Sequence, residues 1–394
     1  MDQSHTHFEC REGEVLAEVR GQVGLVTLNR PKALNALSLG MVRTITQALL
    51  AWKADDKVKA VAMRGMGREA AFGAFCAGGD IRFFHQAALA GDPQLEDFFS
   101  EEYALNHLIH RYDKPCLVFM DGVVMGGGMG LAQGASLRWV TEHTKMAMPE
   151  TLIGLFPDVG GGYFLSRCQG ALGEYLGLSG QVLTGAQAVY VGLADVLCPS
   201  ADLPVLWDSL PGLDWQHAQT ALRTLVQPYA AHTAQAKATV PEWWNDTLDQ
   251  VFSLADVPAI LNALAQLTDE AATTTLTALG KRSPLMLAVT LAQIRRARDM
   301  SLADELRMER DMVRHSFHPR HLQRAPAQSD TVEGIRALAV DKDHAPQWQP
   351  QRIEDVTAEM VQGFFHSPWP AHAHPLRMLS DQATTRKLTH GLQP

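Results

Sequence analysis

Two spacings of apolar residues divide the chain into regions of different predicted structure. Alternating apolar runs at 14–20 and 22–28 flank Gly21 and predict a β-hairpin. Ser38 is placed to cap a helix, and residues 58–63 form an apolar run typical of a buried strand. The inward stripe predicted for that helix consists of Val42, Ile45, Leu49 and Trp52.

Strand and helix patterns alternate again in the next part of the chain. Strand-like runs cover residues 116–120 and 137–141, and a glycine cluster at 126–130 lies between them. Repeated strands and helices in this order are typical of an α/β core. We therefore predict an α/β fold for this part of the protein.

The pattern changes near Pro199. From about Ala201 onward the strand signals fade, and Ala, Leu, Gln and charged residues dominate a region interrupted by several prolines. The sequence therefore predicts a core over residues 1–200 and a helical C-terminal region over residues 201–394. We expect the helical region to cover a functional site or to build a contact between subunits.

The composition narrows the class of protein without identifying it. The chain has 394 residues, of which 46% are hydrophobic and 20% charged, as in ordinary globular proteins. Its formal net charge of -9 at pH 7 argues against a nucleic-acid partner. The net charge does not exclude a local basic patch that binds a phosphorylated ligand.

The cysteines and the N-terminal residues carry our expectation about the compartment. The 5 cysteines are widely spaced and include no CxxC pair, so they predict neither a disulfide framework nor a zinc site, and we expect no metal. Residues 1–15 are acidic and lack both an apolar run and the Arg-rich character of a transit peptide. No stretch approaches the roughly 18 apolar residues of a membrane span. We therefore expect no membrane partner and a cytoplasmic location.

Two glycine-containing segments are candidates for binding negative charge. Gly78 and Gly79 follow a predicted strand, and Gly126 and Gly127 lie between a strand and a helix. Backbone N–H groups can approach a ligand there because glycine has no Cβ, and at a helix start they lie at the positive end of the helix dipole. Two such donors converging on one point would form an oxyanion hole. Taken one at a time, each segment is also explained as a tight turn.

Residues 65–70 match the GxGxxA pattern of dinucleotide-binding folds after a predicted strand. Residues 71–74, the next four in the chain, lack helical periodicity and soon meet more glycine. The strand–turn–helix context that the motif requires is therefore missing, and we do not expect a dinucleotide site.

Three carboxylates stand in apolar surroundings. Glu150 and Asp158 lie within 146–162, an apolar segment rich in proline and glycine, where desolvation raises a carboxyl pKa toward values useful for acid and base catalysis. A helix cap or a solvated loop position is the alternative for each. Glu102 falls on a predicted apolar helix stripe, unless the helix end lets it reach water. That stripe comprises Leu95, Phe98, Leu105, Ile109 and Tyr112.

These segments, in this order, resemble the crotonase (enoyl-CoA hydratase/isomerase) superfamily and, in detail, its 3-hydroxyisobutyryl-CoA hydrolase branch. The resemblance begins at 29–37 and covers nearly the whole chain, although 201–281 matches only in helical character. The run 156–162, FPDVGGG, is its most specific part. Further matching segments are 75–82, 101–103, 126–130, 148–155, 283–284, 333–337, 341–343 and 346–348.

The resemblance implies a fold and a set of site residues. The implied fold is a ββα spiral core with a helical C-terminal region, and relatives of this kind commonly assemble as trimers or hexamers. The backbone amides of Gly79 and Gly127 would form the oxyanion hole. Glu150 matches a glutamate shared with the hydratases, and Asp158 matches the aspartate of the hydrolase branch. Where the hydratases carry a second catalytic glutamate, this chain has Gly130.

The resemblance also implies the residues that contact an acyl-CoA substrate. Glu102 matches a substrate-contacting glutamate. Arg30, Lys32 and Arg82 are candidates to meet the CoA phosphates, although any one of them is equally explained as surface charge. The remaining implied contacts are Gly78, Asp80, Ile81, Gly126, Ala33 and Leu34.

The activity implied by this resemblance is hydrolysis of a short 3-hydroxyacyl-CoA thioester, as in valine catabolism. CoA is part of the substrate, and no separate cofactor is expected. Glu150 either attacks the carbonyl, giving a mixed anhydride, or activates a water. Asp158 either binds the 3-hydroxyl group or protonates the departing sulfur. An enoyl-CoA hydratase or isomerase and a non-catalytic acyl-CoA-binding protein are the alternatives.

Overall fold

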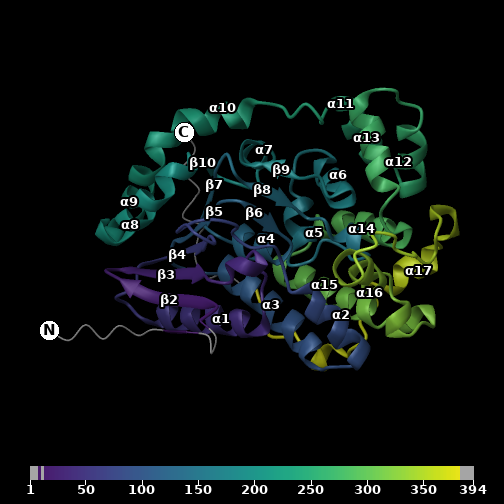
Figure 1. The fold of residues 1–394 in the computed structure, drawn as a ribbon, viewed down its shortest axis with the longest axis horizontal. Coiled ribbons are helices and arrows are strands. Elements are labelled where there is room, and N and C mark those ends of the chain that lie inside the picture. The colour runs from purple at the N-terminus through teal and green to yellow at the C-terminus, as the bar shows by residue number, and fades with distance from the viewer. Residues whose placement is uncertain (1–7, 10–12, 382–394) are drawn as a thin grey trace.

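The computed structural model describes residues 8–9 and 13–381 of the chain (Figure 1). Cys10 and most of the N-terminal segment, on which the expectation about targeting rests, lie outside the described residues. Within the described part, the strands lie before residue 200, and the regular structure after that residue is helical. The change from strands to helices thus falls near Pro199, and the division into two functional regions stays a prediction.

A seven-stranded sheet in the order β1-β2-β3-β4-β5-β7-β10 forms the centre of the core. The predicted hairpin is confirmed, because β2 and β3 pair antiparallel with Val15 opposite Leu28. From β3 to β10 each neighbouring pair is parallel, as alternating strands and helices indicate. The strands span Phe8–Glu9 (β1), Val15–Arg20 (β2), Val23–Leu28 (β3), Ala60–Gly65 (β4), Cys116–Met120 (β5), Leu137–Val140 (β7) and Val196–Leu197 (β10).

A second, three-stranded sheet has the order β6-β8-β9. Strand β6 (Val123–Met125) pairs parallel with β8 (Lys145–Ala147), and β8 pairs antiparallel with β9 (Leu183–Thr184). An isolated bridge joins Cys76 to Val124 of β6. This bridge brings the first glycine segment beside the strand that leads into the second.

Helix α1 (Leu39–Ala54) forms as its sequence predicts. The Ser38 hydroxyl accepts the Met41 N–H, and the predicted inward stripe is buried. The following strand begins at Ala60 rather than Val58, because the Val58 N–H is taken by Asp55 O in the turn after the helix. Further helices of the core are α2 (Ile81–Ala90), α3 (Gln94–His110), α4 (Gly127–Gln133), α5 (Gly161–Leu165), α6 (Leu172–Ser179) and α7 (Gly185–Tyr190).

The first helices of the C-terminal region pack on the face of the main sheet that is remote from the site. Trp207 and Leu222 join Phe119 and Trp139 of the sheet in a separate hydrophobic cluster. Figure 1 shows these helices together at one end of the molecule. They are α8 (Leu203–Ser209) and α9 (Ala218–Val226), and the next helix, α10 (Ala230–Ala238), packs against α7 and β10.

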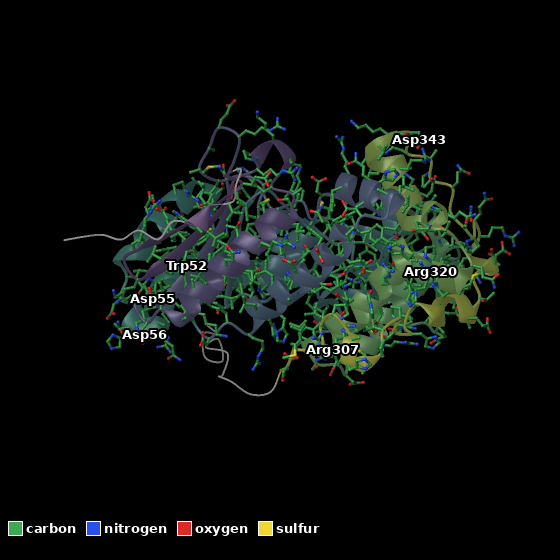
Figure 2. All side chains as sticks on the ribbon, turned by 90° about the horizontal axis from the view of Figure 1, so that it is seen from below. Trp52, Asp55, Asp56, Arg307, Arg320 and Asp343 are labelled. Atoms are coloured by element: carbon green, nitrogen blue, oxygen red, sulfur yellow. The ribbon has the colours of Figure 1, made fainter. Side chains whose placement is uncertain are left out.

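The later helices of the C-terminal region lie at the other end of the molecule. Figure 2 shows Arg320 and Asp343 there, opposite Trp52 and Asp55 of the N-terminal part. No helix in the described ranges is both long and apolar enough to cross a membrane. These helices are α11 (Asp246–Phe252), α12 (Val257–Leu264), α13 (Glu270–Leu279), α14 (Pro284–Ala297), α15 (Leu302–Phe317), α16 (Asp330–Ile335) and α17 (Ala358–Gly363).

Candidate active site

Two glycine amides are left free by the local backbone structure. Gly79 forms a bridge with Leu37, in which the Leu37 N–H donates to Gly78 O (2.8 Å). The Leu37 carbonyl accepts the Asp80 N–H (3.0 Å). This pairing uses groups on either side of Gly79, so the Gly79 N–H points away from Leu37. Gly127 is the first residue of α4, where an N–H has no acceptor within the helix.

The two amides lie side by side although they come from distant segments. A Cβ placed on Gly127 would lie 3.5 Å from the Gly79 nitrogen. A Cβ placed on Gly78 would lie 3.6 Å from the Gly127 nitrogen. Gly78 and Gly126, which precede the two donors, have φ angles of +100° and +49°, a region that side-chain-bearing residues rarely adopt. The two segments therefore present a pair of neighbouring donors.

A cavity of about 210 Å³ lies in front of these amides. Its wall is largely apolar and includes Ile335 and Leu338 from the C-terminal region. The later C-terminal helices therefore reach the site, whereas α8 and α9 do not line it. The predicted site residues that line the cavity are Gly78, Gly79, Ile81, Glu102, Gly126, Gly127, Glu150 and Asp158.

Two glutamates border the pair of amides. Glu150 begins a short 3-10 helix (Glu150–Ile153, η2), and its Oε1 lies 3.0 Å from the position of a Cβ on Gly126. Glu102 Oε1 lies so close to the position of a Cβ on Gly127 that the two would collide. Both carboxyls are buried, and among the described residues Glu102 Oε1 and Glu150 Oε2 have no hydrogen-bond partner. Glu102 therefore does not reach water, and Glu150 is not a solvated loop residue.

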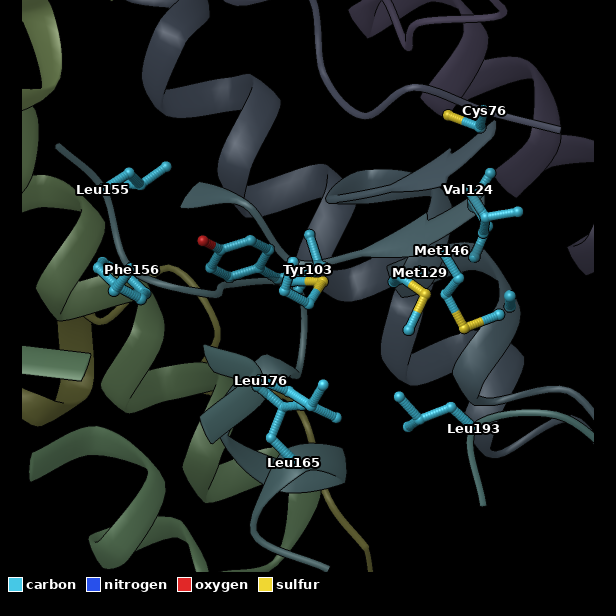
Figure 3. Close-up of a cluster of buried hydrophobic side chains, with 14 of the residues drawn as sticks. Cys76, Tyr103, Val124, Met129, Met146, Leu155, Phe156, Leu165, Leu176 and Leu193 are labelled. Atoms are coloured by element: carbon cyan, nitrogen blue, oxygen red, sulfur yellow. The ribbon is translucent and has the colours of Figure 1, made fainter. Parts of the chain in front are cut away.

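Asp158 is held by a hydrogen bond from α3. The Tyr103 hydroxyl donates to Asp158 Oδ2 at 2.8 Å, and both side chains are buried. Figure 3 shows Tyr103 inside the hydrophobic cluster with its hydroxyl toward the segment that carries Leu155 and Phe156. Asp158 follows directly in that segment. Helix α3 thus supplies both Glu102 and the donor that orients Asp158.

Burial dominates the protonation of the three carboxyls. It raises the pKa of Glu102 and of Glu150 well above the usual range, and the charge of Asp158 adds to both shifts. The pKa of Asp158 rises to about 7, first through burial and then through Glu309, while the Tyr103 hydrogen bond opposes the rise. With a pKa of about 7, the Asp158 carboxyl can take up or release a proton near neutral pH.

The residues expected to contact CoA lie at one side of this site. Leu34 O accepts the Ala77 N–H at 3.0 Å, which joins the segment containing Ala33 to the first glycine turn. Leu34 is 43% exposed, and Lys32 and Arg82 are also exposed. The surface position of these side chains is compatible with binding a soluble phosphate. Their contact with CoA stays a prediction.

Arg30 and Asp80 form an ion pair rather than free binding groups. The Arg30 guanidinium lies 2.8 Å from Asp80 and 3.2 Å from Glu14. Asp80 also caps α2 by accepting the Phe83 N–H. In this structure Arg30 therefore fixes the first glycine turn to the sheet. A direct role of either residue in substrate binding stays a prediction.

Gly130 has no room for a side chain. A Cβ there would lie 2.7 Å from the Val159 Cβ and 2.9 Å from Asn106 Nδ2. Both distances are below those of real Cβ contacts. The space beside Gly130 is thus filled by Val159 and Asn106.

Sequence reasoning missed several residues around Asp158. Tyr103 and the carboxylates Glu305 and Glu309 were not singled out, nor was Gln293, and all four are buried. Glu305 and Glu309 are four positions apart on α15 and lie among buried apolar residues of that helix. The apolar-stripe pattern that identified Glu102 would have found them. Tyr103 carries no comparable signal, because a buried tyrosine is ordinary core composition.

Comparisons with known proteins identify the family. A family model described as enoyl-CoA hydratase/isomerase matches residues 23–365, so the chain belongs to that family. The mitochondrial 3-hydroxyisobutyryl-CoA hydrolase of Xenopus tropicalis is 39% identical over 363 residues, covering 92% of this chain and 91% of that protein. 3-Hydroxyisobutyryl-CoA hydrolase 1 of Arabidopsis thaliana is 39% identical over 359 residues, covering 90% and 92%. The predicted hydrolase branch is confirmed.

The expected fold is confirmed by a solved structure. A carnitinyl-CoA dehydratase from Mycobacterium thermoresistibile superposes with a TM-score of 0.77 at 36% identity. The match covers 91% of this chain and 97% of that chain. The α/β core with a helical C-terminal region is therefore an arrangement already seen in the family.

The expected cytoplasmic location is wrong. The frog relative and the corresponding chicken and rat hydrolases are mitochondrial by name. The expectation rested on the cysteines and on residues 1–15. Neither feature distinguishes one reducing compartment from another, so the composition was too weak a basis for a location.

Proposed function

We propose that this protein hydrolyses the thioester of 3-hydroxyisobutyryl-CoA to free CoA and the hydroxy acid. One observation carries the proposal: the free amides of Gly79 and Gly127 and the carboxyls of Glu150 and Asp158 line the same buried cavity. The names of the similar hydrolases agree with that substrate. A role in valine catabolism stays a prediction.

In the proposed reaction the thioester oxygen binds between the two glycine amides. Both donors are fixed by the backbone before substrate arrives, so they stabilise the developing oxyanion without reorganisation. Removal of one such donor typically lowers the rate by roughly 10²–10³-fold. Glycine at both positions also lets the carbonyl approach the backbone closely.

Glu150 directs the attack on the carbonyl carbon, either itself or through a water. The amide pair and Asp158 line the same cavity as Glu150. Asp158, with its pKa near 7, supplies a proton to the departing sulfur or hydrogen-bonds the 3-hydroxyl group. A thiolate with an ordinary thiol pKa of about 8.5 leaves readily. These steps require CoA only as part of the substrate.

Hydration of a double bond is the second candidate, because the solved relatives include proteins named as hydratases. The hydratases that the chain resembles carry a second catalytic glutamate where this chain has Gly130. A side chain there would collide with Val159 and Asn106. The lack of this particular glutamate favours hydrolysis.

A thiol-release assay across CoA esters with and without a 3-hydroxyl group tests the function. We expect the highest kcat/KM for 3-hydroxyisobutyryl-CoA. The Glu150→Gln variant should lose about 10²–10⁴-fold in kcat and still bind CoA. Glu270→Gln, at an exposed position of α13, is the matched control and should retain full activity. Water addition to an enoyl-CoA without thiol release would contradict the proposal.

We also propose that residues 1–200 carry the chemistry and that residues 201–394 close the acyl cavity and build any contact between subunits. The position of Ile335 and Leu338 in the cavity wall supports the proposed closure of the cavity by the C-terminal region. Assembly as a trimer or hexamer stays a prediction. Sedimentation of the full chain, with and without substrate, measures it.

A further inference from the structure

Asp158 stands at the start of a turn with an uncommon backbone conformation. Val159 has a φ angle of +58°, which β-branched residues rarely adopt, and Gly160 follows with +88°. Such conformations persist when surrounding contacts fix them. The groups that fix this turn therefore determine where the Asp158 carboxyl points.

Side chains from two C-terminal helices hold this turn on both sides of Asp158. Glu309 of α15 accepts the Gly160 N–H at 2.7 Å and the Gly162 N–H at 3.1 Å. Gln293 of α14 donates to Pro157 O at 2.7 Å and to Glu309 Oε1 at 2.9 Å. Together these bonds tie the residue before Asp158 and two residues after it to the helical region.

The Glu309 carboxyl has a buried acidic neighbour. Glu305 lies one helical turn earlier, and both side chains are fully buried. Burial raises the pKa of both carboxyls, and their mutual repulsion raises that of Glu309 further. Two adjacent buried carboxyls repel each other when both are ionised. Both Glu309 oxygens accept N–H donors, and the bonds from Gly160 and Gly162 favour its ionised form.

The charge of Glu309 reaches the active site. The titratable groups that face it are Glu305 on its own helix, Asp158 on the turn, Glu102 and Tyr103 on α3, and Glu150 on η2. In Asp158, Glu309 is the largest cause of the raised pKa after burial. Glu309 thus holds the turn that carries Asp158 and also raises the pKa of its carboxyl.

We propose that Glu309 is a positioning residue of the active site, which holds the turn that aims Asp158 into the cavity and keeps a negative charge beside it. The proposal rests on the proposed hydrolase function. It makes α15 part of the catalytic centre, although Glu309 is not among the described residues that line the cavity.

Two substitutions separate geometry from charge. Glu309→Gln keeps the side-chain length and removes the charge. We expect the limb of the pH–rate profile that Asp158→Asn abolishes to move to lower pH by about one unit. Glu309→Asp keeps the negative charge, but the shorter side chain no longer reaches the Gly160 and Gly162 N–H groups. We expect kcat to fall by about 10²-fold while KM and the position of the limb change little.

Asp304→Asn is the matched control, because Asp304 lies on the exposed side of the same helix. It should leave kcat and the pH profile at wild-type values. A folded Glu309→Gln protein with an unmoved limb, or a folded Glu309→Asp protein with wild-type kcat, overturns the proposal. If Glu309→Gln does not fold, Glu309→Asp decides the question alone. A lowered melting temperature with neither kinetic change would show a role in folding only and also overturns it.

Failure of the proposed function is recognised separately. Wild-type protein that releases no thiol from any ester refutes the hydrolase activity, and the role of Glu309 is then tested by a direct titration. The ¹³C carboxyl signal of Asp158, assigned by its loss in Asp158→Asn, should titrate at lower pH in Glu309→Gln than in the wild type. Equal midpoints would overturn the effect of Glu309 on Asp158.

Discussion

The Tyr103 hydroxyl donates a 2.8 Å hydrogen bond to Asp158 Oδ2 and so links α3 to the turn opposite the glycine amides. This bond favours the ionised carboxyl and opposes the effect of burial on its pKa. Tyr103→Phe should therefore raise the pKa of Asp158 above about 7. The pH–rate limb assigned to Asp158 should move to higher pH.

The pH dependence of thiol release measures this shift. Tyr229→Phe is a matched control, since the Tyr229 hydroxyl donates to Asp202 at 3.0 Å on the far side of the main sheet. It removes the same kind of bond at a site without catalytic groups. A limb that stays in place in Tyr103→Phe, or that moves equally in both variants, contradicts the assignment.

Asp158→Asn should stabilise the fold at alkaline pH. Because burial raises the pKa of Asp158 from 3.8 to about 7, the folded state binds its proton more tightly than the unfolded state. Wild-type stability therefore falls as the pH rises through this window, and the loss is complete above about 7. The asparagine does not ionise and avoids this loss, which is on the order of 4 kcal/mol.

Urea unfolding at pH 4 and at pH 8 measures the difference. We expect the variant to exceed the wild type in free energy of unfolding at pH 8 and to approach it at pH 4. Equal stability of the two proteins at pH 8 would show that Asp158 is not desolvated in the folded state.

Glu150 can act by two routes that labelled water distinguishes. In single-turnover hydrolysis in ¹⁸O water, an anhydride route in which water attacks the enzyme acyl group places label in the Glu150 carboxyl. A general-base route places it only in the product acid. Mass spectrometry of the peptide that contains Glu150 reads the outcome. Label confined to the product would rule out this form of the covalent route.

Gly130→Ala should destabilise the protein by about 1–3 kcal/mol, because the added Cβ collides with Val159 and Asn106. Gly130→Glu should not create hydratase activity for the same reason. Gly212→Ala is the control, since no atom lies within 4 Å of a Cβ at that position. A stable Gly130→Glu protein that hydrates an enoyl-CoA would contradict this expectation.

The sequence predicted the parts of this molecule that obey local rules. The hairpin, the capped helix α1 and the parallel strands arise from apolar spacing and turn residues, and each is found. Glu102 could be predicted because helical periodicity alone placed it on a buried face. The pairing of Gly79 with Gly127 required the order of segments along a known family.

Contacts between distant segments could not be predicted in this way. The ion pair between Arg30 and Asp80 depends on how the first glycine turn packs, and neither local sequence specifies that packing. Glu309 meets Gly160 across the interface between the core and the C-terminal region. Local periodicity places a carboxylate on a buried face, but it does not name the backbone amide that the carboxylate will meet.

Residues of the core and of the C-terminal region together form the cavity wall. The amides and carboxyls proposed to react come from the core, whereas Ile335 and Leu338 of the C-terminal region contribute apolar side chains to the same cavity. Changes at these two aliphatic positions alter the volume available to the acyl chain and leave the reacting atoms in place. Substitutions at these two positions could thus adapt such an enzyme to esters of another size without changing the amides or the carboxyls.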